Sequence, residues 1–245
     1  YASTRQGLMH ACGHDLHTCT GLGVARLLAK EPRLGARVRL LFQPAEELAQ
    51  GAVWMRDAGA VEGLDALFGL HVVPNLPVGT VGIRRGCLTA AAGELEILVQ
   101  GEGGHGARPH QAVDAVWLAA RVITELQQAI ARRLDALQPV VISFGKVEGG
   151  RAFNVIADQV RLLGTVRCLD LQQHALLPAW IEEMVQGICG SGGGTAVVSY
   201  RCIAPPVHND PQLTALLERC AVGCLGRDKV LPVEQPSLGA EDFAE

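Results

Sequence analysis

The chain has 245 residues and a formal net charge of −4, from 21 basic and 25 acidic residues, and 49% of its residues are hydrophobic. This composition supports a buried core in one large domain or two ordinary ones. It offers no basic stripe for phosphates or anionic lipids, no apolar run near the roughly 20 residues of a membrane helix, and no signal-peptide pattern. We therefore expect a globular protein that binds neither nucleic acid nor membranes.

The eight cysteines are scattered along the chain. A secreted disulfide scaffold has a much higher density, so the spacing favours a reducing compartment and a cytoplasmic location. Cys220 and Cys224 fall on one face of an expected helix, but no further Cys/His pair stands near them to complete a zinc site. We interpret these two as core thiols.

Residues 9–17, with the sequence Met-His-Ala-Cys-Gly-His-Asp-Leu-His, combine three histidines, one cysteine and one aspartate. Thiolate and imidazole bind borderline-soft divalent metals well, and a carboxylate beside an imidazole often fixes its tautomer. The alternative is a polar turn that happens to collect histidines. We interpret the stretch as a metal site.

Residues 18–30 carry apolar side chains at helical spacing and stop before Pro32, which predicts a helix. Residues 36–42 are apolar and β-branched enough for a buried strand that ends just before Glu46 and Glu47. Adjacent acids are usually a solvated helix start, where the helix dipole favours them. Here they follow the carboxyl end of a strand, where open α/β sheets bind ligands, so they are also site candidates.

A third extended run, residues 66–73, ends its apolar stretch with His71. A lone histidine in such a strand is more often a core residue with satisfied hydrogen bonds. Because this is the third strand-end or turn segment to supply a ligand-type side chain, we expect His71 to join the metal site.

From Glu94 onward the pattern alternates strand, helix, strand, strand, helix and strand, over residues 95–99, 109–134, 140–147, 160–168, 171–188 and 195–201. This order is the split ferredoxin-like βαββαβ motif. A helix over 213–225 and a strand and turn over 231–245 follow. We expect residues 89–203 to form a domain inserted into a larger one, which comprises residues 1–88 and 204–245.

Residues 101–106 satisfy the G-x-G-x-x-G pattern between a strand and a helix, which can indicate dinucleotide binding. A bound pyrophosphate needs a helix that opens at the glycines, whereas Arg108 and Pro109 delay the helix here. We expect the glycines to shape a tight turn that presents His105.

Six segments resemble the M20 metallopeptidases, in the same order: residues 9–15, 42–47, the run with His71, 103–110, 153–156 and 237–243. The likeness covers essentially the whole chain and is closest to the amidohydrolases that include hippurate hydrolase, N-acetyl-amino-acid deacetylases and auxin-conjugate hydrolases. It implies an α/β fold, with a zinc-exopeptidase-like catalytic domain of mixed sheet and flanking helices. The inserted ferredoxin-like domain would be a lid that also dimerises.

The resemblance implies a role for each matching residue near the metals. Glu46 would be the general base that activates water, and Asp15 would orient a ligand. The implied metal ligands are four side chains, with the first a bridge between two ions: Cys12, His14, Glu47 and His71.

In the lid, the resemblance makes His105 a residue that steadies the developing oxyanion in the partner subunit's active site. Asn154 and Arg167 would hold the substrate carboxylate, although a solvated strand charge is an ordinary alternative for Arg167. Glu241 matches a motif near the site, but the resemblance assigns it no role.

The implied activity is hydrolysis of the amide bond of N-acyl amino acids, such as N-acetyl or N-benzoyl derivatives, by a homodimer. Mixed O, N and S ligands accept two ions of Mn²⁺ or Zn²⁺, and also Co²⁺ or Ni²⁺. The family's last metal-binding histidine lies beyond Glu245 and an aspartate-bearing strand precedes Tyr1, so we expect a copy truncated at both ends. The alternative is an impaired remnant that still dimerises through the lid or binds ligand.

Overall fold

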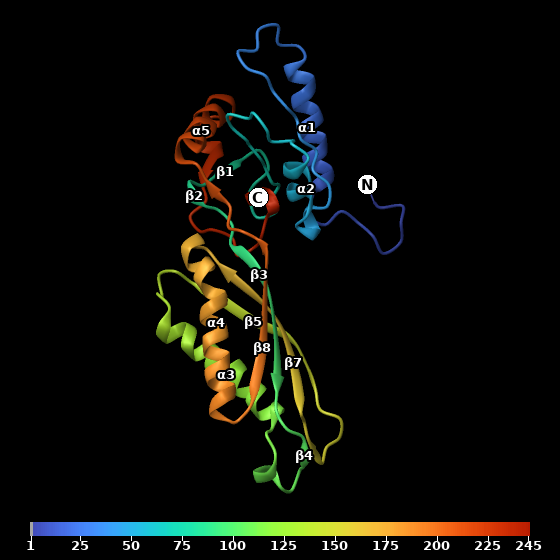
Figure 1. Cartoon of the computed structure of the whole chain (residues 1–245). Coiled ribbons are helices and arrows are strands. Elements are labelled where there is room, and N and C mark those ends of the chain that lie inside the picture. Colours follow the sequence, from blue (N-terminus) through green and yellow to red (C-terminus); the bar gives the residue numbers. More distant parts are fainter. Residues whose placement is uncertain (1) are drawn as a thin grey trace. The chain divides into compact units, whose positions relative to one another are not determined.

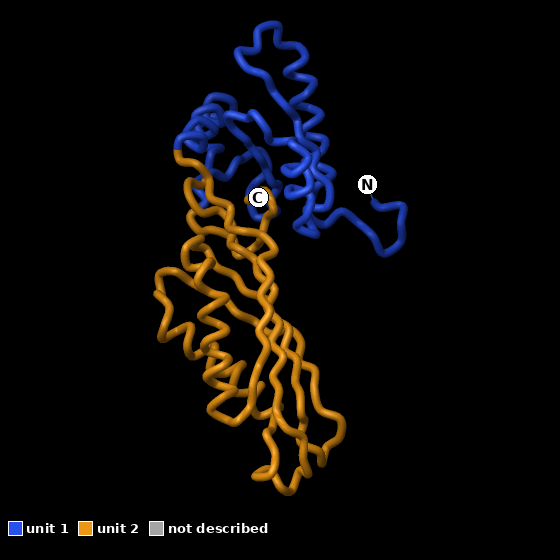
Figure 2. The backbone as a smooth tube through the Cα atoms, viewed as in Figure 1, with its two compact units in different colours: residues 1–83, 212–233 blue, residues 84–211, 234–245 orange. Residues whose placement is uncertain are grey.

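The computed structural model describes residues 2–245 and divides into two compact units (Figure 2). Unit 1 comprises Tyr1–Ile83 and Gln212–Val233, and unit 2 comprises Arg84–Pro211 and Glu234–Glu245. Within the described residues, no helix has both the length and the apolar character that a membrane crossing requires.

Unit 2 is built on a four-stranded antiparallel sheet in the order β5-β7-β3-β8, with α3 and α4 against one face (Figure 1). The chain order of these elements is the predicted βαββαβ. Their bounds are β3 Ala91–Gln100, α3 Ala115–Arg133, β5 Val140–Gly149, β7 Gln159–Cys168, α4 Leu171–Ser191 and β8 Thr195–Ala204.

Side-chain periodicity explains why these elements pack together. In β3 every second residue faces the helices, and Leu95, Ile97 and Val99 are fully buried. In α3 the buried residues recur at helical spacing, as Leu118 and Val122 do. These two faces meet in the hydrophobic core of unit 2.

Helix α3 begins at Ala115, six residues after the predicted start at Pro109 (115 − 109 = 6). The Asp114 carboxylate fixes this start, because it accepts hydrogen bonds from the amides of Val116 and Trp117 at 2.9 and 3.1 Å. Pro109–Gln111 forms a separate 3₁₀ turn, η2. The glycines of residues 101–106 therefore do not open a helix, which is the feature that a bound pyrophosphate requires.

Shorter pairings complete unit 2. Strand β4 (Gly104–His105) pairs with β6 (Val155–Ile156), and β2 (Gly86–Cys87) pairs with β9 (His208–Asn209). A 3₁₀ turn, η4, spans Asp242–Ala244.

Unit 1 contains less regular structure. Its helices are α1 (His14–Leu28), α2 (Gly51–Asp57) and α5, which spans Pro211–Leu225. Two 3₁₀ turns are η1 (Glu46–Leu48) and η3 (Arg227–Lys229), and β1 (Val81–Ile83) pairs in parallel with β10 (Val230–Pro232). Helix α1 begins four residues before its predicted start (18 − 14 = 4), so His14 lies within its first turn.

Two predicted strands of unit 1 are wrong. Residues 36–42 and 66–73 form no strand, and large apolar side chains in them are exposed, Phe42 by 48% and Phe68 by 49%. A strand requires a neighbour that accepts and donates its ladder hydrogen bonds. Within residues 2–245 no strand pairs with either segment, so unit 1 has the parallel pair β1 and β10 in place of a larger mixed sheet.

The interpretation of Cys220 and Cys224 as core thiols is also wrong. Both are exposed, and Thr214 is the one residue of α5 that is buried in the structure.

Candidate metal centre

The turn before α1 places Cys12 and His14 on either side of Gly13. Gly13 has a φ of 87°, in the left-handed region that glycine adopts without steric cost. A Cβ at this position would lie 2.4 Å from the Cγ2 of Val72. The glycine therefore allows both the sharp turn into the helix and the close approach of the segment that carries His71.

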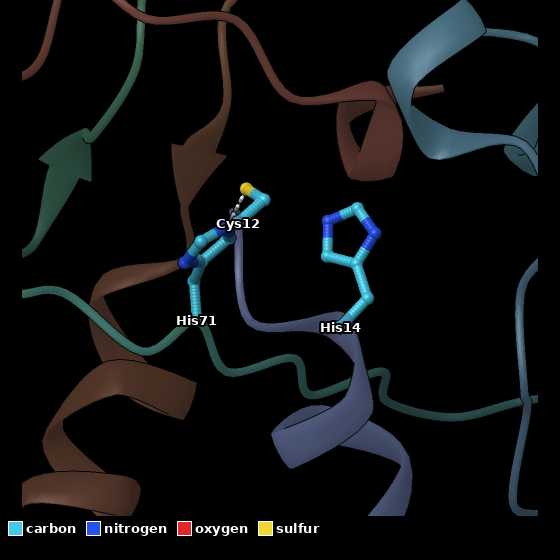
Figure 3. A group of neighbouring side chains, drawn as sticks. All are labelled: Cys12, His14 and His71. Carbon is cyan, nitrogen blue, oxygen red and sulfur yellow. Dashed lines mark hydrogen bonds between the residues drawn. The ribbon is translucent and has the colours of Figure 1, made fainter. Parts of the chain in front are cut away.

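Cys12, His14 and His71 come together although they are up to 59 residues apart in sequence. One ligand atom from each side chain lies within 4.8 Å of the other two. The Cys12 Sγ is 3.2 Å from the His71 Nε2, and Figure 3 shows this contact with the His14 ring beside it. The turn before α1 and the loop after residue 66 thus supply one thiol and two imidazoles to a common point.

Glu46 and Glu47 also lie close to His14. The His14 Nε2 is 3.4 Å from the Glu46 Oε2 and 3.8 Å from the Glu47 Oε1. These three side chains form a second group whose ligand atoms also lie within 4.8 Å of one another. His14 therefore belongs to two adjoining groups of donor atoms.

The backbone around the two glutamates is unusual. Ala45 and Ala49 flank η1 with φ values of 54° and 50°, which are uncommon for residues that have a Cβ. Such conformations cost free energy and cluster at functional sites. The Glu46 side chain is 22% exposed and that of Glu47 is 68% exposed. The alternative interpretation of these acids as a solvated helix start therefore fits only Glu47.

The donor atoms suit divalent ions. A thiol, imidazoles and carboxylates are the ligands that zinc accepts, and mixed sets of this kind also accept manganese, cobalt or nickel. The His71 Nδ1 lies 2.6 Å from the carbonyl oxygen of Val72, a contact that orients the ring and leaves its Nε2 facing Cys12. The residues present therefore fit a metal centre.

His17 belongs to the stretch that the sequence indicated as a metal site, but it received no individual role there. Its Nε2 accepts a 2.9 Å hydrogen bond from the amide of Val72. Burial lowers the pKa of His17, His71 and His14 lower it further, and the charge of Asp15 opposes them. The i, i+3 spacing from His14 was the one available sequence signal, because a backbone partner 55 residues away leaves no mark on the sequence.

Two of the predicted residues in unit 2 lie close together. His105 in β4 is paired with Val155 of β6, and the amide of Gly106 donates to the carbonyl oxygen of Asn154 at 2.9 Å. The His105 Nδ1 accepts from the amide of Ala107 at 3.1 Å. His105 and Asn154 are both exposed at this end of the unit.

Arg167 lies near the other end of β7, where it is paired with Ala92 and Val141. It donates to the carbonyl oxygen of Val166 at 3.0 Å and to the hydroxyl of Thr165. Eight residues of extended chain separate Gln159, at the start of β7, from Arg167 (167 − 159 = 8), which corresponds to about 26 Å. The structure does not bring Arg167 to His105 and Asn154 within one chain.

Glu241 is the N-cap of η4, and its Oε1 accepts a 3.2 Å hydrogen bond from the amide of Phe243. This contact gives Glu241 a local structural role in unit 2.

Relatives of known sequence match the entire chain. A Synechocystis protein named as a probable hydrolase is 55% identical over 245 residues, which are 100% of this chain and 62% of that protein. An N-acetylcysteine deacetylase of Bacillus subtilis is 39% identical over 246 residues, 100% of this chain and 64% of the relative. The chain thus spans about three fifths of the length of these relatives.

A solved structure agrees with the fold. The crystal structure of a Bacillus subtilis protein, described as a dinuclear metal binding peptidase from the M20 family, superimposes with a TM-score of 0.85 at 35% identity. The match covers 99% of this chain and 62% of that one. The family described as Peptidase family M20/M25/M40 matches residues 1–245. Because this match covers the full sequence, the chain belongs to peptidase family M20/M25/M40.

Proposed function

We propose that this protein hydrolyses the amide bond of small N-acyl amino acids by metal-dependent catalysis. The observation that carries the proposal is the convergence of a thiol, two imidazoles and two carboxylates from three separate segments of unit 1. The similarity to an N-acetylcysteine deacetylase supports an N-acyl amino acid as the class of substrate.

In this proposal, divalent ions are held by four side chains: Cys12, His14, Glu47 and His71. Such ions, when bound, polarise a carbonyl group and lower the pKa of water from about 15.7 to about 7. The mixed donor set suits Mn²⁺ or Zn²⁺, with Co²⁺ and Ni²⁺ as alternatives. The N–H···O contact of His71 with Val72 keeps the His71 lone pair available at Nε2.

The two adjacent carboxylates divide the work. Successive residues point their side chains in different directions, so one can bind an ion while its neighbour handles protons. Glu46, the more sheltered of the two, takes the proton of the attacking water and delivers it to the leaving amine. Asp15, in the first turn of α1, orients a ligand in this proposal, and its negative charge acts on His17.

We further propose that unit 2 is a lid through which two chains dimerise. Asn154 precedes β7 in the chain and β6 pairs with the strand of His105, whereas about 26 Å of extended strand separates Gln159, at the start of β7, from Arg167. A small acyl amino acid is shorter than this distance, so these residues serve one substrate only if two chains contribute. His105 then stabilises the oxyanion, and Asn154 and Arg167 bind the carboxylate.

The experiment compares Glu46→Gln with Glu47→Gln in the hydrolysis of N-acetyl and N-benzoyl amino acids with added Mn²⁺. We expect Glu46→Gln to retain metal and lose about 10²- to 10⁴-fold in kcat, because only the general base is removed. We expect Glu47→Gln to bind metal more weakly. If the wild-type protein is inactive and Glu46→Gln behaves identically in every assay, the proposed enzymatic activity is contradicted. Dimerisation or ligand binding by such an inactive protein would then favour the alternative of an impaired remnant.

A further inference from the structure

Both polar groups of the Val72 backbone are bonded to histidines. The Val72 amide donates to the His17 Nε2 at 2.9 Å, and the Val72 carbonyl oxygen lies 2.6 Å from the His71 Nδ1. The two rings are in edge contact, with centroids 4.5 Å apart and an interplanar angle of 69°. A single residue of the chain therefore connects the two imidazoles.

These contacts fix where each ring carries its proton. A backbone amide can only donate, so the His17 Nε2 is unprotonated and its lone pair is used by Val72. A carbonyl oxygen can only accept, so the His71 Nδ1 carries a proton and its Nε2 lone pair faces the Cys12 sulfur at 3.2 Å. The Nε2 of His71 is therefore available to bind a metal, whereas the Nε2 of His17 is already used by the Val72 amide.

We infer that His17 is a positioning residue, which fixes Val72 and through it the orientation of His71, and that it is not a metal ligand. The expected effect on metal affinity rests on the proposed function, because a displaced His71 would bind an ion less well. Groups that orient a metal ligand typically contribute 10- to 100-fold to metal affinity.

The surroundings of Val72 support this role. Val72 lies in a segment without a paired strand, so no ladder hydrogen bond holds it in place. On one side its Cγ2 lies against Gly13, where a Cβ would approach to 2.4 Å. Its amide is held by His17, one turn into the same helix. Gly13 and His17, which precede and follow His14 in the sequence, thus both contact Val72.

The first test measures amide hydrogen exchange at Val72 in the metal-free full chain at neutral pH. We expect His17→Leu to speed exchange roughly two- to tenfold, because the amide loses its acceptor. His17→Gln should restore slow exchange, since the Gln Oε1 reaches the position of the imidazole Nε2. His17→Asn is too short to do so and serves as a polar control if the Leu variant does not fold. Unchanged exchange in His17→Leu and His17→Asn would overturn the inference.

The second test measures Mn²⁺ and Zn²⁺ affinity by calorimetry in the same proteins, with His71→Gln as the comparison for a lost ligand. We expect a 10- to 100-fold weaker affinity for His17→Leu, and near wild-type affinity for His17→Gln. Equal losses in His17→Leu, His17→Gln and His71→Gln would identify His17 as a ligand and overturn the inference. A wild-type protein that binds neither metal would contradict the proposed function, and the exchange result would then decide the role of His17.

Discussion

The two units differ in what their side chains do. In unit 2, α3 alone buries six residues, and strands and helices share one hydrophobic core. In unit 1, α1 buries none, and Val230 is the one buried hydrophobic residue among those that the structure describes there. The residues of the main hydrophobic core and the candidate metal ligands thus lie in different units.

The starts of the two helices show the same difference. Helix α3 has a side-chain cap from Asp114, whereas the N-cap of α1 is Gly13, which has no side chain to cap it. The first turn of α1 instead presents His14 and His17, which contact the site. Changes in the core of unit 2 should therefore affect stability, and changes at the start of α1 should affect metal binding.

The largest effect that would test this difference comes from one substitution made in both units. Leu118→Ala removes a side chain that is 0% exposed in the core of unit 2, and we expect a loss of about 2 to 5 kcal/mol of unfolding free energy. Leu27→Ala, at a position of α1 that is 71% exposed, should change it by less than about 0.5 kcal/mol. Urea unfolding followed by circular dichroism measures both changes. Equal losses of unfolding free energy in the two variants would contradict the difference between the units.

A smaller effect concerns the buried histidine of unit 2. The His174 Nε2 and the Tyr200 hydroxyl are 2.7 Å apart, between α4 and β8. Burial lowers the pKa of His174 and raises the pKa of Tyr200 to about 12. The pair is neutral in the folded state, and its polar atoms are satisfied by each other.

This burial predicts a pH dependence of stability. Above pH 6.5 His174 is neutral in both states, so it adds no pH dependence. Below pH 6.5 the unfolded chain binds a proton that the folded core resists, so stability falls until the lower folded pKa is reached, by at most about 1.4 kcal/mol per pH unit. We expect His174→Gln, which keeps a polar partner for Tyr200, to have a shallower decline between pH 6.5 and 5.5 in urea unfolding. Parallel declines in both proteins would contradict this.

The core of unit 2 could be predicted from the sequence because its patterns are local. The alternation in β3 and the helical spacing in α3 and α4 indicate which face of each element is buried. The buried faces of the strand and of the helices pack against each other within unit 2. Residues 36–42 and 66–73 carry an equally apolar pattern but form no strand. Composition describes the side chains of a strand, whereas its formation depends on a neighbouring strand that composition does not specify.

The candidate site was predictable as a set of residues and unpredictable as an arrangement. Cys12 and His14 are close in sequence, and residue type alone indicated a metal site there, while the resemblance implied their roles as ligands. The positive φ of Ala45 and Ala49 around the glutamates had no sequence signal, because neither is a glycine. The hydrogen bond from Val72 to His17 was hidden as well, since backbone donors are the same at every residue except proline.

Equilibrium metal binding in Cys12→Ser and Cys220→Ser tests most directly whether unit 1 holds ions at the predicted point. Both substitutions replace one sulfur by oxygen in unit 1, but only Cys12 lies against His71. We predict more than about tenfold weaker Mn²⁺ or Zn²⁺ binding for Cys12→Ser and wild-type binding for Cys220→Ser. Equal losses in the two variants, or full metal loading of Cys12→Ser, would contradict the metal centre described for this chain.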